Sequence, residues 1–153
     1  MAVWVHQDAT LEPRVAEERI LRSILAIAEI AGGLSERFAL PFPLRIGAGV
    51  DRGEVVVGNF GGEGSADHTA LGPAVNRAFR LEAATRSLNC DILLSSSAYQ
   101  PWQESFPALR FRVEHVSLKG FPEETTVYAG SFTQLREIVT PSPRVQDAKN
   151  CAD

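Results

Sequence analysis

The stretch from Thr69 to Glu82 constrains the fold of this chain more than any other. Residues 69–71 form a short extended piece, and Gly72-Pro73 then starts a helix, because proline lacks the N–H group that a first helical turn would leave unpaired. Asn76 and Arg80 lie one turn apart in that helix and therefore share a face. An amide and a guanidinium projected together form a donor-rich cluster that suits phosphate oxygens. The sequence therefore predicts a strand followed by a helix that carries a polar face.

Two interpretations of this polar pair remain open from spacing alone. Val75, Phe79 and Ala83 form a separate, apolar face of the helix, which is expected to run to about Ser87. Matched polar residues at helical spacing are also common on faces that meet only solvent. The pair therefore indicates either a ligand site or an ordinary solvated surface.

Composition excludes several classes of function. At 153 residues the chain is long enough for one domain with a substantial core. Its net charge of −4 offers no broad basic surface, so nucleic acid is not an expected partner. No apolar run reaches membrane-spanning length and no signal-peptide pattern is present, so we expect a cytoplasmic protein. Cys90 and Cys151 lack metal-ligand spacing and are expected to be free thiols.

The first half of the chain shows helical and then strand periodicity. Apolar residues recur at helical spacing from Val15 to about Phe38, which predicts a long helix packed on a sheet. Residues 44–50 alternate, residues 51–53 suit a tight turn, and residues 54–59 suit a returning strand, so we expect a hairpin. Gly47 and Gly49 leave one face of that hairpin bare, where a ligand or another chain could approach closely.

Shorter patterns complete the prediction. Residues 60–66 are glycine-rich and are expected to form a flexible connector. Three serines at 95–97 are expected to cap a short helix toward Trp102. The polar, proline-containing stretch 132–153 is expected to be a disordered tail, which leaves residues 1–131 as the folded domain. Strands are expected at residues 1–6, 67–71, 91–94, 109–114 and 125–130.

Three motifs in the same order resemble the class III adenylate/guanylate cyclase catalytic domain. The central one is Gly-x-x-Val-Asn-x-Ala-x-Arg-Leu-Glu at residues 72–82. The segment 44–59 resembles the family's central hairpin, and residues 116–121 resemble its late Lys-Gly strand. The resemblance covers residues 1 to about 131 and implies an α+β, ferredoxin-like nucleotide cyclase fold with an antiparallel-rich sheet. It is specific for the family but not for activity.

The resemblance implies roles for individual residues. Asn76 would position the ribose, and Arg80 would stabilise the charge that develops on the α-phosphate. Thr69 would read the purine edge, with Leu71 beside it in the substrate-binding set, although a hydroxyl does not by itself select adenine over guanine. The substrate-binding set also includes two cations that would contact the triphosphate, Arg45 and Lys119. Both cations have a plainer interpretation as solvated surface residues.

The implied reaction is the conversion of ATP to 3′,5′-cyclic AMP and pyrophosphate at a dimer interface, in cyclic-nucleotide signalling. The alternative is a non-catalytic nucleotide-binding or regulatory cyclase-like subunit. In the family two metal ions, Mg or Mn, are held by two aspartates in segments that would precede Met1, as would the first strand. We therefore expect this chain alone to be inactive, the metal ligands to come from residues outside it, and the reading frame upstream of Met1 to encode the missing half.

Overall fold

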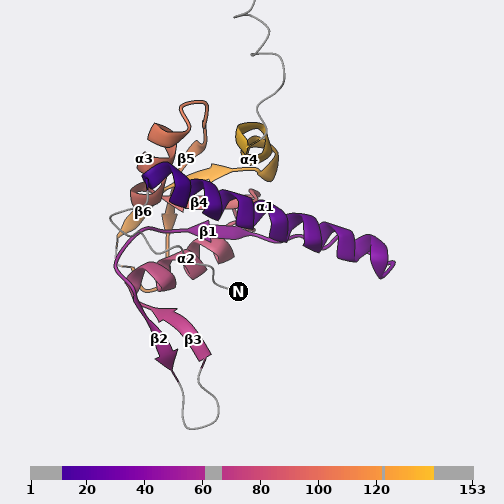
Figure 1. The fold of residues 1–153 in the computed structure, drawn as a ribbon, viewed down its shortest axis with the longest axis horizontal. Helices are drawn as coiled ribbons and strands as arrows, with labels where there is room; N and C mark the ends of the chain where they lie inside the picture. The colour runs from indigo at the N-terminus through magenta and orange to yellow at the C-terminus, as the bar shows by residue number, and fades with distance from the viewer. Residues whose placement is uncertain (1–11, 61–66, 122, 140–153) are drawn as a thin grey trace, which may run out of the picture.

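A mixed four-stranded sheet forms the centre of the protein in a computed structural model that describes residues 12–60, 67–121 and 123–139 (Figure 1). Its strands are β1 (Ala48–Val50), β4 (Ile92–Ser95), β5 (Arg112–Ser117) and β6 (Glu124–Gly130). They are ordered β1-β4-β6-β5; β1 runs parallel to β4, and the other neighbours are antiparallel. This arrangement confirms the predicted α+β class with an antiparallel-rich sheet.

Helices cover both faces of this sheet (Figure 1). They are α1 (Pro13–Arg37), α2 (Pro73–Ala84), α3 (Ser96–Ser105) and α4 (Phe132–Val139). Strand β4 is buried on both sides, and alternate residues point to opposite faces. Ile92 and Leu94 pack with α1, α3 and α4, whereas Leu93 packs with Leu81 of α2. Two apolar layers therefore enclose the central strands. Of the four described helices, α2 covers one face of the sheet, and the other three cover the opposite face.

The predicted hairpin over residues 44–59 is wrong. Its second strand, β2 (Val56–Phe60), pairs with β3 (Asp67–Leu71) in a separate two-stranded sheet, in which Val56 lies opposite Leu71. Strand β1 instead takes β4 as its parallel partner. The segment between β1 and β2 is therefore a connection between two sheets and not a tight hairpin turn. The β2–β3 unit projects away from the central sheet (Figure 1).

The structure confirms some of the predicted helix and strand boundaries and differs from others by a few residues. The long helix is α1, and Ser95 caps α3 by accepting a hydrogen bond from the Ala98 backbone N–H at 3.3 Å. The strand expected at 109–114 begins three residues later, because Leu109 and Phe111 are buried in irregular chain beside α3. The predicted strand at 1–6 and connector at 61–66 lie outside the described residues.

The prediction of a disordered tail from residue 132 is wrong at its start. Residues 132–139 form α4, and the Leu135 side chain has no solvent exposure. This helix packs against the same core as α1, since Leu135 contacts the cluster that contains Leu21 and Leu25. Residues 140–153 lie outside the described part of the chain.

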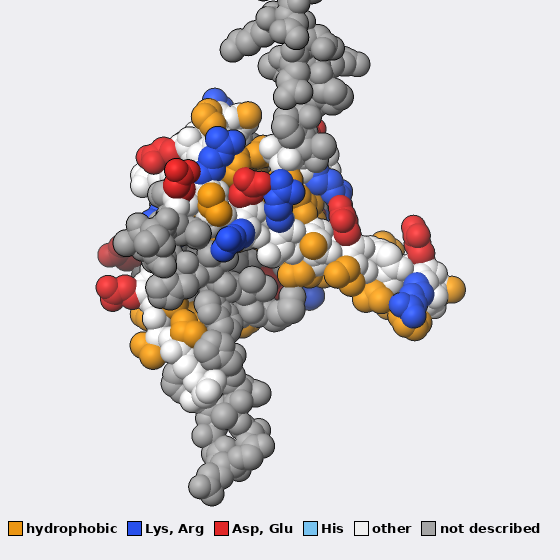
Figure 2. All heavy atoms as spheres, in the orientation of Figure 1, with side chains coloured by type: hydrophobic (Ala, Val, Ile, Leu, Met, Phe, Trp, Pro, Cys, Tyr) orange, Lys and Arg blue, Asp and Glu red, His pale blue; other side chains and the backbone are white. Residues whose placement is uncertain are grey.

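The second half of α1 extends beyond the sheet and carries hydrophobic side chains along its length (Figure 2). Ile30 is 65% exposed, and Phe38, just after the helix, is 62% exposed. Within the described residues, no helix is long and apolar enough to cross a membrane.

Candidate nucleotide site

Helix α2 carries the motif residues, and it sits directly on the backbone of β1. A Cβ atom on Gly49 would lie 2.1 Å from the carbonyl oxygen of Ala78, and one on Gly47 would lie 2.2 Å from Thr85 Oγ1. Both distances are far shorter than any real contact, so only glycine allows this approach. The bare glycine face, which we expected to admit a ligand or another chain, is therefore occupied by α2.

The face of α2 that packs in the protein contains Ala74 and Leu81. Both side chains are buried, and the Thr85 side chain just after the helix is buried as well. Phe79, on the apolar face identified in the sequence, is 49% exposed and so is not part of the buried face. The reason is steric, because small residues must face a strand whose glycines bring the two backbones together.

Four of the six predicted site residues lie on one continuous strand–helix unit. Thr69 and Leu71 belong to β3, which leads through Gly72 into α2. Gly72 adopts φ 151°, a conformation that disfavours other residues. Asn76 and Arg80 follow one turn apart on α2, and both side chains are exposed. Within the described part of the chain, neither side chain has a hydrogen-bond or ion-pair partner, so both are available to a ligand.

The two predicted triphosphate contacts lie elsewhere on the surface. Arg45 precedes β1 and is exposed, with its Nη2 atom 3.7 Å from Asp91 Oδ1. Lys119 is exposed in the turn between β5 and β6. Among residues 12–60, 67–121 and 123–139, no hydrogen bond or ion pair joins any two of the six predicted residues. The structure thus groups four of them on β3 and α2 and leaves the other two without a direct link.

Exposed apolar side chains lie on the same strand–helix unit and on the strand β2 that pairs with it. Val56 of β2 is 66% exposed and Leu71, opposite it on β3, is 50% exposed. Together with Phe79 of α2 they give this region more apolar surface than a solvated polar face requires. A second surface that covers these side chains would also lie close to Asn76 and Arg80.

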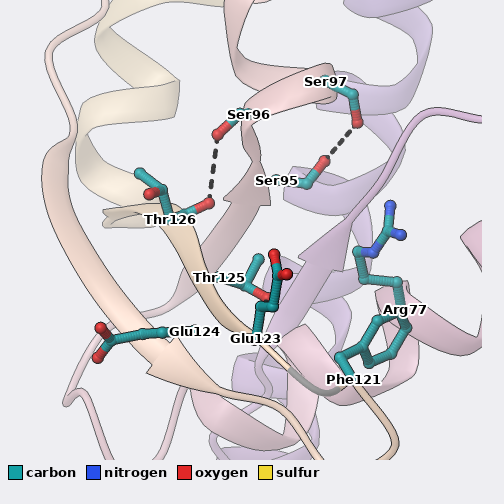
Figure 3. A pocket seen from close by; sticks show the side chains of 9 residues that line it. All are labelled: Arg77, Ser95, Ser96, Ser97, Phe121, Glu123, Glu124, Thr125 and Thr126. Carbon is teal, nitrogen blue, oxygen red and sulfur yellow. Dashed lines mark hydrogen bonds between the residues drawn. The ribbon is translucent and has the colours of Figure 1, made fainter.

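The sequence analysis did not predict a buried polar cluster that links α2 to the start of α3. The Asp51 side chain has no solvent exposure, and its carboxylate contacts Arg77 of α2 and two serines, Ser95 and Ser97. Arg77 and these serines also line a pocket of about 430 Å³ (Figure 3). The sequence pattern predicts that Asp51 lies in an exposed type of structure, a tight turn, and so gives no reason to expect a buried carboxylate. The available signal was its place in the alternation, where it follows Gly47 and Gly49 on the face that meets α2.

A larger groove of about 1150 Å³ lies between α1, β1, α2 and α3, and Glu17 of α1 lines it. Glu17 is only 6% exposed, and Ser105 of α3 donates a hydrogen bond to its carboxylate. Burial raises the pKa of Glu17 above its usual range, although the Ser105 hydrogen bond and the positive charge of Arg52 act in the opposite direction. The ionised form of Glu17 is therefore disfavoured in the folded protein relative to the unfolded chain.

We expect Glu17→Gln to stabilise the protein more at pH 7.5 than at pH 4. A raised folded-state pKa contributes stability at low pH that is lost as pH rises through it, above about pH 4.3 for a glutamate. The neutral amide avoids this loss and still offers Ser105 an acceptor. Urea unfolding of both proteins at several pH values measures the difference. A difference that stays constant across this range would contradict the account.

The described residues do not present a metal site. Within residues 12–60, 67–121 and 123–139, no three His, Cys, Asp or Glu side chains are grouped so that they could hold a metal ion. The buried Asp51 carboxylate is already paired with Arg77.

Solved structures of nucleotide cyclases share this fold. The adenylyl cyclase CyaB from P. aeruginosa is 25% identical with a TM-score of 0.62, and the match covers 80% of this chain and 62% of that one. A bacterial light-regulated adenylyl cyclase is 25% identical with a TM-score of 0.54, over 82% of this chain and 39% of the other. In fold and sequence the chain resembles class III nucleotide cyclase domains. The structure of a guanylyl cyclase, 24% identical with a TM-score of 0.58, shares the fold of this cyclase-type domain.

Curated sequences add two relatives of the cyclase-type domain. An adenylate cyclase of Anabaena cylindrica is 37% identical over 87 residues, which are 56% of this chain and 17% of that protein. An uncharacterized protein of Mycobacterium tuberculosis is 31% identical over 119 residues, 77% of this chain and 21% of that protein. No model of a known protein family matches. The chain spans about a fifth of the length of these curated relatives.

Proposed function

We propose that this domain supplies the nucleotide-contacting half of a cyclase site that it shares with a second cyclase chain, and that the site converts ATP to 3′,5′-cyclic AMP and pyrophosphate. The observation that carries the proposal is the pair Asn76 and Arg80, exposed one turn apart on a helix that enters directly from the strand bearing Thr69. A guanidinium and an amide with no partner in the described protein are suited to phosphate and ribose oxygens.

The reaction needs a fixed cation at one place. The ribose 3′-oxygen attacks the α-phosphorus and loses its proton, while the bond from that phosphorus to the bridging oxygen breaks and pyrophosphate leaves. Negative charge grows on the α-phosphate oxygens during attack, and Arg80 would stabilise it. Asn76 would hold the ribose so that the 3′-oxygen is aligned, which lowers the entropic part of the barrier. Thr69 would contact the purine from the adjoining strand.

Divalent metal ions are expected in this reaction, because they lower the pKa of the attacking hydroxyl and neutralise the triphosphate. Among the described residues, no three His, Cys, Asp or Glu side chains are grouped to hold such an ion. We therefore assign the Mg or Mn ligands to residues outside the described chain and derive no step through the metals. The contribution proposed for this domain is restricted to binding, orientation and charge stabilisation.

A second chain is proposed because the site region is both polar and apolar. Leu71 and Phe79 are exposed on the same strand–helix unit as Asn76 and Arg80, Val56 is exposed opposite Leu71 on β2, and a monomer gains nothing from exposing them. A partner that covers these side chains would complete the site and exclude water from it. Either a second copy or a different cyclase domain meets this requirement.

The test mixes the purified chain with a cyclase protomer that keeps its metal-binding aspartates but has alanine in place of its own motif Asn and Arg. Neither protein alone should produce cyclic AMP from ATP with Mg²⁺ or Mn²⁺, and the mixture should. Titration of the chain at fixed partner concentration should give saturation, as expected for a complex. If the mixture stays inactive although the chain binds a fluorescent ATP analogue, the non-catalytic nucleotide-binding alternative is favoured.

A further inference from the structure

The contact between β1 and α2 lacks the interlocking side chains that usually fix how a helix lies. Gly47 and Gly49 present backbone atoms to α2, and Gly53, further along the same face, would place a Cβ 3.1 Å from Ala74 Cβ. Helix position is normally set by side-chain ridges that fit into grooves of the neighbour. A strand face made of glycine offers no ridges, so the position of α2 along and about its axis depends on other contacts, which are the packing of Leu81 with Leu93 and the ion pair of Arg77.

Asp51 occupies the one position of this face, between Gly49 and Gly53, that carries a side chain. Its Oδ2 atom lies 3.0 Å from Arg77 Nη1 on α2, and the carboxylate has no solvent exposure. Its Oδ1 atom accepts a hydrogen bond from Ser95 Oγ at 2.5 Å and lies 3.1 Å from Ser97 Oγ. Both serines stand at the start of α3, which the central strand β4 holds in place. The carboxylate therefore links α2 to a rigid part of the core.

Arg77 is held on a second side as well. The centre of its guanidinium lies 5.0 Å from the centroid of the Phe121 ring, beyond the turn that contains Lys119, as Figure 3 shows for the two side chains. The residue follows Asn76 directly and precedes Arg80 by less than one turn. Any rotation or shift of α2 that breaks the contact with Asp51 must therefore redirect both predicted site residues.

We propose that Asp51, oriented by Ser95 and Ser97, is a positioning residue that acts through Arg77 to fix the direction in which α2 presents Asn76 and Arg80. The inference rests on the function proposed for those two residues. The alternative is a pair that contributes stability alone. Buried ion pairs are often no more stabilising than apolar residues of the same volume, whereas they do specify one arrangement where packing leaves several open.

The test uses Asp51→Asn in the full chain, in the mixture with the aspartate-bearing protomer. Asparagine keeps the shape and an acceptor for the serines but removes the charge that holds Arg77. We expect kcat to fall by roughly 10- to 100-fold, the effect of a misplacement of about 1 Å, with a much smaller change in KM for ATP. The double variant Asp51→Asn/Arg77→Gln leaves no unpaired buried charge, so it should fold and show the same fall. Glu18→Gln, which breaks the exposed Arg22–Glu18 pair on α1, is the control.

Two further readouts separate positioning from stability and from the proposed function. In an Asn76→Ala/Arg80→Ala background, Asp51→Asn should lower kcat by no more than about twofold, because it acts through those two side chains. An equal loss in both backgrounds would indicate a structural role and overturn the inference.

The second readout does not depend on activity. In the isotope-labelled chain, Asp51→Asn should change the amide chemical shifts along α2 from Ala74 to Leu81. Changes confined to residues 51, 77, 95 and 97 would also overturn it. If the wild-type chain fails to rescue activity, the proposed function fails, and the chemical shifts alone decide whether the pair positions α2.

Discussion

Gly49→Ala is expected to destabilise the domain by about 3 kcal/mol or more, the upper part of the range for overpacking. The added Cβ would lie 2.1 Å from the Ala78 carbonyl oxygen and 2.5 Å from the Glu82 backbone nitrogen. Both are backbone atoms of α2, so no side chain can move aside, and the helix itself must shift. Urea unfolding followed by circular dichroism measures the change in the free energy of unfolding.

Gly33→Ala on α1 is the matched control for this prediction. A Cβ at that position meets nothing within 4 Å, so the change should stabilise the helix by about 0.5–1 kcal/mol. The two substitutions are chemically identical and differ only in what the new methyl group contacts. A Gly49→Ala protein as stable as the wild type would mean that α2 does not lie on β1 as described.

Arg80→Ala is expected to lower the rate of cyclic AMP formation in the mixed assay by roughly 10²–10³-fold, a loss of about 2.7–4 kcal/mol of transition-state stabilisation. The side chain is exposed and has no ion-pair partner in the described protein, so its removal should leave the free energy of unfolding nearly unchanged. The loss should appear mainly in kcat, because the charge it offsets develops during attack.

Arg86→Ala, just after α2, is the control for Arg80→Ala. It removes an exposed guanidinium outside the motif and should leave the rate of the mixed reaction close to that of the wild type. A chain that carries Arg80→Ala and still rescues activity fully would show that Arg80 is only a solvated surface residue. The phosphate role proposed for it would then be abandoned.

The sequence was informative where the pattern is local. The periodicity of α1, the apolar run of β4 and the cap at Ser95 all depend on neighbours in the chain, and the structure confirms them. The strand–helix unit with Thr69, Asn76 and Arg80 was also foreseen, because proline and glycine mark where the helix begins. Whether these residues bind nucleotide stays a prediction.

The sequence was misleading where the outcome depends on partners far along the chain. Alternation over residues 44–59 is compatible with a hairpin, but β1 pairs with β4 and β2 with β3, and nothing local encodes that choice. The tail composition concealed α4, whose stability comes from burial of Leu135 in the main core. Gly47 and Gly49 indicated a close approach correctly, yet the approaching group is α2 and not a ligand.

The central claim is that the exposed face of α2 contacts the nucleotide in a site completed by a second chain. The most direct measurement is an NMR titration of the isotope-labelled chain, saturated with the aspartate-bearing protomer, with a non-cyclisable ATP analogue. We expect chemical-shift changes centred on Thr69, Asn76 and Arg80. The Arg80 side-chain Nε–H signal should be among those that change, and it should be missing from the spectrum of Arg80→Ala. Changes confined to the pocket beside Arg77 or to the groove along α1, with Asn76 and Arg80 unaffected, would contradict it.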